Sequence, residues 1–264
     1  MRMANTIDTI YALWLRELKR FIKSKSRLIG TGGQPLIWLA IIGVGFGSAF
    51  AVGGISGAFG KVSYVTFLAP GVIGMTILFT SIFAGINVIW DKQFGFLKEI
   101  LVAPVPRSAI VLGKIAGSAT VSLITALVIF VVIVIANVIP LHLLSVLGIL
   151  ESMVFMVLIS SIFVSIGLII ASYINNIEGF QVLINFLVLP MFFLSGALFP
   201  LENAPLWMKS LSLIDPLRYG VDGMRGALIG ISSYSMITDF AVVLGIAIGL
   251  IIIADIAFRN MQAK

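Results

Sequence analysis

The side chains that could carry out chemistry are few in this sequence, and they stand far apart. His142 is the only histidine and there is no cysteine, so a histidine-based metal site or acid–base pair has no second member. The letters Gly54-Ile55-Ser56-Gly57 form a GxSG pattern, which could hold the serine nucleophile of an intramembrane protease. The pattern stands in a glycine-rich stretch, however, and a flexible turn explains it more simply.

A loop that could bind the phosphates of ATP is also missing. The nearest approach to the pattern GxxxxGK[ST] is Gly113-Lys114, which is followed by Ile115. The first glycine of the pattern is replaced by Ser108. We therefore expect no catalytic residue, no metal and no cofactor in this chain.

The composition indicates that the solvent of this chain is lipid. Of its 264 residues, 60% are hydrophobic and only 11% are charged. An ordinary soluble domain is about 45–50% apolar and about 25% charged. So few charges could not cover a soluble globule of this size, which excludes a soluble enzyme and a disordered chain. The absence of cysteine excludes a disulfide scaffold.

Long windows without charge predict an all-α integral membrane protein. A membrane-spanning helix needs about 20 mostly apolar residues, and each window holds one such span. The six predicted spans cover approximately residues 34–53, 66–89, 116–138, 152–173, 179–199 and 240–258. Residues 226–238 are also uncharged but too short to cross, so we expect them to be interfacial or re-entrant.

The basic residues predict the orientation. If the N-terminus is cytoplasmic, the inner segments hold 13 of the 17 Lys and Arg residues and the outer segments hold 4. This bias predicts that both termini are cytoplasmic in a multi-pass protein of the cell membrane. The net charge of +6 is then largely a consequence of topology, and nucleic acid is not an expected partner.

Residues 1–28 are expected to form an amphipathic helix that lies on the cytoplasmic face of the membrane. Apolar and basic residues gather on opposite faces at helical spacing, which suits an anionic headgroup layer. Two roles remain open: a topology anchor alone, or also a brace for a cytoplasmic partner. The apolar face holds Ile7, Ile10, Tyr11, Trp14, Leu18, Phe21 and Ile22, and the basic face holds Arg16, Lys19, Arg20, Lys23 and Arg27.

The inner loop 91–114 is long and half apolar. We expect a short helix within it that ends at Pro104-Val105-Pro106, because proline disfavours helix at and before its position. Exposed apolar residues beside mixed charges are typical of a docking surface, and a second interfacial helix is the alternative.

The outer segment 200–230 carries a regular pattern of charges. Asp215-Pro216 is a helix start, with an N-cap residue followed by proline at the first helical position. Asp215, Arg218, Asp222 and Arg225 then alternate in sign along one face. Such a ladder could let a polar helix enter the membrane partway, and a solvated outer helix is the alternative.

The fifth span carries the polar residues that could face a transport path. Gln181 and Asn185 lie on it, and Pro190 is expected to kink it. No acidic residue is predicted at the middle of the bilayer, which argues against a proton- or ion-coupled carrier.

Two blocks of sequence resemble the permeases of the ABC type-2 transporter family. The first block, LAPGVIGMTILFTSIFAGINVIWDKQFGFLKEILVAPVPRSAIVLGK (68–114), is similar to the second span and coupling segment of that family. The second, LSGALFPLENAPLWMKSLSLIDPLRYGVDGMRGALIG (194–230), is similar to the region after its fifth span. The closest similarity is to permeases of daunorubicin-type drug exporters, and the layout of polysaccharide and nodulation-factor permeases is the same.

The resemblance implies a domain of residues 29–264 that follows the N-terminal helix and forms one half of a transporter. Such permeases form homodimers or heterodimers and bind a separate ATPase subunit, which holds ATP and Mg²⁺. By the resemblance, a coupling helix at residues 91–103 would enter the ATPase, and the segment 200–230 would be re-entrant and line or gate the outer end. The implied coupling residues are Phe94, Gly95, Leu97, Glu99 and Leu101, and the implied gate residues are Asp215, Pro216, Arg218, Tyr219, Asp222 and Arg225.

The expected function is ATP-driven export of hydrophobic or amphipathic compounds. Export of a lipid-linked glycan is the alternative within the same architecture. An ATP-independent carrier or a membrane scaffold would be an alternative of another class.

Overall fold

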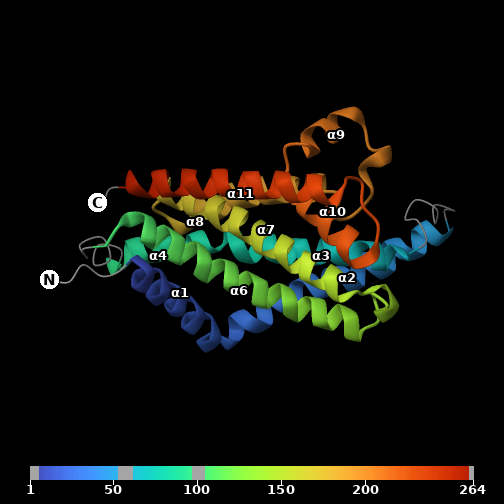
Figure 1. The fold of residues 1–264 in the computed structure, drawn as a ribbon, viewed down its shortest axis with the longest axis horizontal. Coiled ribbons are helices and arrows are strands. Elements are labelled where there is room, and N and C mark those ends of the chain that lie inside the picture. Colours follow the sequence, from blue (N-terminus) through green and yellow to red (C-terminus); the bar gives the residue numbers. More distant parts are fainter. Residues whose placement is uncertain (1–5, 53–61, 97–104, 262–264) are drawn as a thin grey trace.

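A computed structural model describes residues 6–52, 62–96 and 105–261 of the chain. This part of the chain contains helices and their connections and no β-strand, so the predicted all-α fold is confirmed. The long helices run roughly along one common axis (Figure 1). In order, the α-helices of the described residues are α1 (Thr6–Lys23), α2 (Lys25–Val52), α3 (Tyr64–Ile82), α4 (Ala84–Gln93), α6 (Arg107–Ile135), α7 (Val146–Tyr173), α8 (Ile177–Leu194), the short α9 (Leu206–Ser212), α10 (Pro216–Ile229) and α11 (Met236–Arg259).

Five helical stretches of the described residues are long and apolar enough to cross a membrane. The predicted first span falls in α2, whose apolar part Gly33–Gly47 is shorter than a full span. A sixth span therefore stays a prediction. The five stretches are Tyr64–Gln93, Arg107–Ile135, Val146–Tyr173, Ile177–Leu194 and Met236–Arg259.

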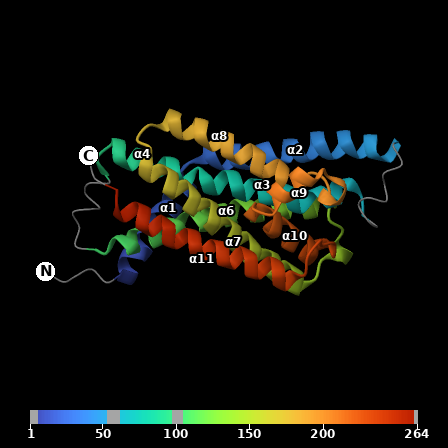
Figure 2. The same ribbon diagram turned by 90° about the horizontal axis from the view of Figure 1, so that it is seen from above.

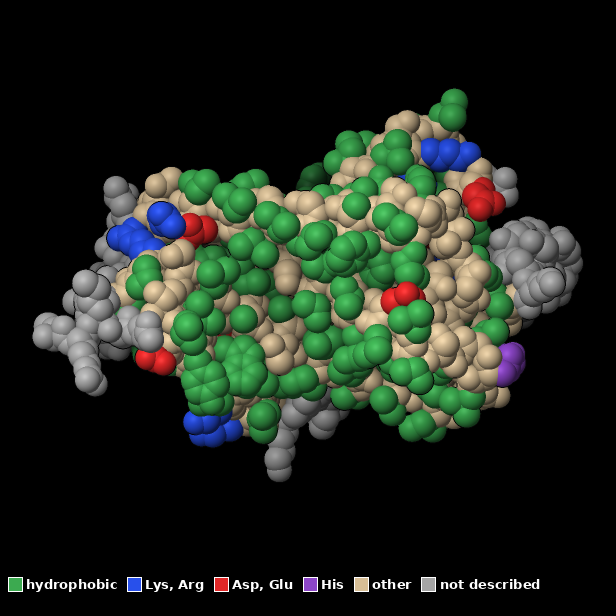
Figure 3. Space-filling view, in the orientation of Figure 1, with side chains coloured by type: hydrophobic (Ala, Val, Ile, Leu, Met, Phe, Trp, Pro, Cys, Tyr) green, Lys and Arg blue, Asp and Glu red, His purple; other side chains and the backbone are tan. Residues whose placement is uncertain are grey.

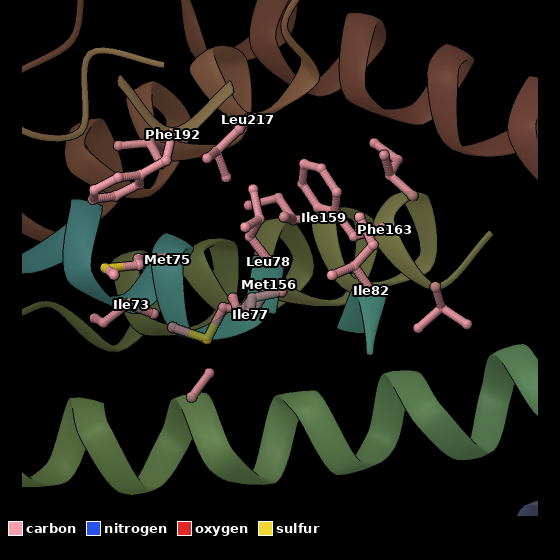
Figure 4. Packing of buried hydrophobic residues seen from close by; sticks show 14 of the residues in the cluster. Ile73, Met75, Ile77, Leu78, Ile82, Met156, Ile159, Phe163, Phe192 and Leu217 are labelled. Carbon is pink, nitrogen blue, oxygen red and sulfur yellow. The ribbon is translucent and has the colours of Figure 1, made fainter. Parts of the chain in front are cut away.

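Helix α3 lies in the centre of the bundle. Its residues are apolar on every side, which is the pattern of a helix that is buried all round. Figure 2 shows α3 between α2 and α8 on one side and α7 and α11 on the other. Figure 4 shows how Leu78 and Ile82 of α3 meet Ile159 and Phe163 of α7 in the core.

The predicted second span, residues 66–89, is divided into two helices. Helix α3 ends at Ile82 and α4 begins at Ala84, with Phe83 between them. Just after this break, the backbone of α4 touches that of α7: a Cβ atom on Gly85 would lie 2.5 Å from the carbonyl oxygen of Gly167. Glycine is needed at this crossing because any side chain would separate the two helices.

Helix α1 packs against α6 through another pair of glycines. A Cβ on Gly113 would lie 2.9 Å from the Cβ of Leu13, and one on Gly117 would lie 2.8 Å from the Cβ of Glu17. Trp14 of α1 also donates a 3.0 Å hydrogen bond to Thr120 of α6. The N-terminal helix is therefore part of the bundle along this side.

The packing of α1 differs from the simple amphipathic pattern. Phe21 is buried as expected, but Glu17 is buried as well. Three members of the predicted apolar face are exposed by more than half: Ile7, Tyr11 and Ile22. These three side chains therefore lie on the outer surface of α1 rather than in its packing with α6.

Helices α7 and α11, which begin at the end of the bundle away from α1, have side-chain caps. Ser145 accepts a 2.9 Å hydrogen bond from the backbone of Gly148 at the start of α7. Ser235 accepts a 3.2 Å hydrogen bond from the backbone N–H of Thr238 at the start of α11. Both helices begin near α10, whereas α1, the end of α4 and the start of α6 lie at the other end of the bundle (Figure 1). The two candidate sites are built at these two ends.

Substitution of Gly85 tests the α4–α7 crossing. In Gly85→Ala the new methyl group meets backbone, so we expect a loss of about 1–3 kcal/mol in stability. The measurement is thermal unfolding of the purified protein in detergent. Gly249→Ala is the matched control, because a Cβ on Gly249 of α11 has no neighbour within 4 Å. Equal melting temperatures for both variants would contradict the crossing.

Candidate functional site

Three helices meet at the carboxylate of Asp91, near the end of α4. Its Oδ2 atom lies 2.7 Å from Nζ of Lys114 on α6 and 2.7 Å from Nη2 of Arg16 on α1. Asp91 is 7% exposed and Lys114 is 2% exposed. A buried charge is tolerated only when it is paired, so Lys114 and Asp91 hold each other in place.

Glu17 and Asn87 extend this network. Glu17 lies 3.5 Å from Arg16 within α1. Its other carboxylate oxygen accepts a 3.4 Å hydrogen bond from Asn87 of α4. Two side chains of α1 therefore reach α4 by polar contacts. We call Arg16, Glu17, Asn87, Asp91 and Lys114 the Asp91 cluster.

Lys92 and Gln93 attach the end of α4 to the end of α7. The Lys92 ammonium donates to the carbonyl oxygens of Ala171 at 2.6 Å and Ser172 at 3.2 Å. Gln93 donates to the carbonyl oxygen of Asn175 at 3.2 Å. A lysine at these positions satisfies carbonyl groups that a helix leaves unpaired at its C-terminus, and it complements the helix dipole.

The predicted coupling helix at 91–103 does not run as one helix from residue 91. Helix α4 continues to Gln93 and the chain then turns, because Gly95 adopts the left-handed conformation with φ of 76°. Of the predicted coupling residues, Phe94 and Gly95 lie at this turn. The others, Leu97, Glu99 and Leu101, lie outside the described residues.

Aromatic side chains surround the turn. Phe94 is 78% exposed and packs edge-on against Trp90 at 5.9 Å between ring centres. The guanidinium of Arg16 lies 4.6 Å from the ring centre of Phe96, which is also exposed. This end of the bundle therefore presents an aromatic surface directly beside the Asp91 cluster.

The second candidate site is at the opposite end, in α10. Asp215 caps the helix by accepting a 2.9 Å hydrogen bond from the backbone N–H of Leu217, and Pro216 is the first helical residue, as predicted. The other carboxylate oxygen of Asp215 is buried and has no hydrogen-bond partner among the described residues. Burial raises the pKa of Asp215 to about 7, although the Leu217 N–H and the charge of Arg218 act in the opposite direction.

Asp222 and Arg225 of α10 bind backbone groups of other segments. Asp222 accepts hydrogen bonds from the N–H groups of Ser233 at 2.8 Å and Tyr234 at 3.0 Å. Arg225 donates to the carbonyl of Gly196 at 3.0 Å and lies 3.8 Å from the ring centre of Phe67. Burial lowers the pKa of Arg225 to about 10, so it keeps its charge at neutral pH.

Arg218 and Tyr219 complete this arrangement. Arg218 donates to the hydroxyl of Tyr234 at 2.8 Å and to that of Ser212. Tyr219 donates to the carbonyl of Leu213 at 3.0 Å. Within the described chain no ion pair joins the four charges of α10, so they do not form the expected ladder of paired charges. Arg218, Asp222 and Arg225 instead tie α10 to neighbouring segments, and Asp215 caps α10 itself.

The predicted path residues lie on the exposed side of α8. Gln181, Asn185 and Pro190 are all exposed, and Pro190 stands within the helix. Phe186 on the same helix is 83% exposed. The structure therefore separates these residues from α10 and from the Asp91 cluster.

A family model described as ABC-2 type transporter matches residues 8–229, which is most of the chain. The chain belongs to the ABC-2 type transporter family. The match runs from α1 to the end of α10, so it includes both candidate sites. The chain is thus a transport permease with several membrane helices, and the predicted family is confirmed.

The related proteins are permeases from several lineages. A putative transport permease, ycf38, of Pyropia yezoensis is 29% identical over 83% of this chain and 73% of the relative. The inner membrane transport permease YadH of Escherichia coli K12 is 24% identical over 88% of this chain and 87% of its own length. Nodulation protein J of Rhizobium leguminosarum bv. trifolii is 27% identical over 83% of this chain and 80% of its own length.

Sequence reasoning missed the Asp91 cluster. It placed Asp91 and Lys114 at the ends of neighbouring spans and Arg16 on a lipid-facing helix, with no reason to join them. Glu17 was a signal for polar contacts of this helix, because it is an acidic residue among the basic residues that follow Leu15. Asp239 was also missed. It is fully buried in the first turn of α11, and neither carboxylate oxygen has a hydrogen-bond partner among the described residues.

Removal of the Asp91 charge tests the cluster. Asp91→Asn leaves the Lys114 ammonium buried without an anion, so we expect a loss of about 3–5 kcal/mol in stability. Thermal unfolding of the ABC-2 permease in detergent measures this. Asp255→Asn is the control, because it breaks the partly exposed 2.7 Å pair with Arg259, which contributes about 0–1 kcal/mol. Similar small shifts in both variants would rule out a structural role for Asp91.

Proposed function

We propose that this chain is the permease subunit of an ATP-driven exporter of hydrophobic or amphipathic compounds. A separate ATPase subunit binds ATP and Mg²⁺, because this chain lacks a phosphate-binding loop. The permease crosses the cell membrane six times, with both termini cytoplasmic. The family match over residues 8–229 is the observation that carries this proposal.

The geometry of the Asp91 cluster supports a site of force transfer at the cytoplasmic end. The cluster joins α1, α4 and α6 at one carboxylate, a few residues before the coupling segment. Lys92 joins α4 to α7 at the same level. A push by the ATPase on the aromatic surface at Trp90 and Phe94 would then move four helices together rather than bend one of them.

The exposed side of α8 supports a path shared with a second permease. Gln181 and Asn185 are polar, exposed and one helical turn apart on a mostly apolar helix. Polar side chains in a membrane helix normally face protein or a water-filled path rather than lipid. In our proposal a second copy, identical or homologous, covers this side. Helix α10 closes the outer end.

A second candidate substrate is a lipid-linked glycan. The layout that polysaccharide and nodulation-factor permeases share with this chain leaves this class open, and Nodulation protein J is among the similar proteins. An ATP-independent carrier would differ from both, since it would transport its substrate without an ATPase.

The docking surface can be tested with one substitution. Phe94→Asp places a charge on the exposed aromatic surface, so we expect at least about tenfold less ATPase subunit to co-purify with the tagged permease. Leu206→Asp is the matched control, because Leu206 of α9 is 81% exposed at the opposite end. It should retain the ATPase.

The same preparations separate the alternatives when they are reconstituted into liposomes. Flux of an amphipathic dye that requires ATP and the second subunit supports the proposal. Flux of a lipid-linked glycan without flux of the dye would identify the second candidate substrate. Substrate flux by the lone permease would contradict an ATP-driven mechanism, as would wild-type permease that never co-purifies with an ATPase.

A further inference from the structure

A cavity of about 340 Å³ lies between the second and third turns of α7 and the first two turns of α11. Its volume is at the lower end of the range for small-molecule sites, about 300–1,000 Å³. Met236, Ile237 and Phe240 of α11 line one side. Glu151, Val154 and Phe155 of α7 line the other.

The position of the cavity separates it from the proposed path. Figure 2 shows α8 and α11 on different sides of the bundle, with α7 between them. Figure 3 shows a surface over α7 and α11 that is largely hydrophobic, with few acidic side chains. The cavity therefore opens on an apolar surface, which would face lipid if α7 and α11 cross the membrane as proposed.

Glu151 is the unusual member of the lining. It lies five residues into α7, about 7.5 Å along the helix axis from Val146. Val146, Leu147 and Leu150, which precede it, are each more than half exposed and apolar. Among the described residues, Glu151 has no hydrogen bond and no ion pair. A carboxylate in an apolar surface is costly unless a cation compensates it.

The aromatic side chains of the lining favour the same kind of ligand. Phe155 and Phe240 meet edge to face, with 6.5 Å between ring centres. Phe240 is 39% exposed, so part of its ring is accessible from the cavity side. Aromatic faces attract organic cations, whereas Glu151 would repel an anionic group.

We propose that this cavity binds a lipophilic organic cation, with the charge at Glu151 and the apolar part against Phe240 and Met236. Neither a neutral acyl chain nor an anionic amphiphile would use the carboxylate. The site lies apart from α8 and from the Asp91 cluster, so binding requires neither ATP nor the ATPase.

Ethidium, a planar organic cation, is a suitable probe. Its fluorescence is titrated with the purified permease in nanodiscs of phosphatidylcholine, and the signal of empty nanodiscs is subtracted. We expect Glu151→Gln to weaken binding about tenfold through loss of the ion pair, and Phe240→Leu to weaken it about threefold through loss of the aromatic face. Glu202→Gln, which removes the same charge from an exposed position of the outer segment, should bind as wild type.

Two further measurements keep the result interpretable. Glu151→Asp keeps the charge and should bind within about threefold of wild type, which separates loss of charge from loss of fold. Anilinonaphthalene sulfonate, an anion of similar size, should not bind more weakly after Glu151→Gln. Equal ethidium affinity in wild type and Glu151→Gln would overturn the proposal and indicate that lipid fills the cavity. If the permease binds ethidium as expected but transports no substrate with ATP and the ATPase present, the result contradicts the proposed function and leaves the cation site standing.

Discussion

The burial of Asp91 and Lys114 is the constraint on which the cytoplasmic end of this permease depends. The buried Lys114 ammonium pairs with Asp91 alone among the described residues, so it depends on that carboxylate. Because Arg16 shares the same carboxylate oxygen, the pair also fixes the N-terminal helix. An amphipathic helix that would otherwise only lie on lipid becomes a structural part of the transporter. The close approach of α1 to α6 at Gly113 and Gly117 lies beside this cluster.

At the opposite end of the bundle, the charges of α10 are held in a different way. Among the described residues the charges of α10 form no ion pairs with one another. Asp222 and Arg225 are instead hydrogen-bonded to backbone groups of other segments. Arg225 binds the turn after α8 and Asp222 binds the loop before α11. Helix α10 therefore connects the elements around it. In the proposed transporter a movement of α8 would reach α10 through the turn at Gly196.

Features with a local cause could be predicted from the sequence. The spans follow from charge-free windows, and the start of α10 follows from Asp215-Pro216 because both of its signals are adjacent in the chain. The break at Phe83 could not be predicted in this way, because it goes with a close approach of Gly85 to Gly167, a residue 82 positions away. The Asp91 cluster depends on three helices that the sequence does not place together. The charge pattern of α10 was visible, but the partners of Asp222 and Arg225 are backbone groups, which no side-chain pattern reveals.

Disulfide cross-linking tests most directly whether Asp91 holds α1 against α6. The chain has no native cysteine, so Leu13→Cys with Gly113→Cys introduces a single possible pair. A Cβ on Gly113 would lie 2.9 Å from that of Leu13, so the helices must move apart by roughly 1 Å to reach the Cβ separation of a disulfide. The rate of disulfide formation is measured in membranes under mild oxidation. The predicted result is rapid, nearly complete cross-linking, and slower, incomplete cross-linking when Asp91→Asn is added. Identical rates and yields in the two backgrounds would contradict the central role of Asp91.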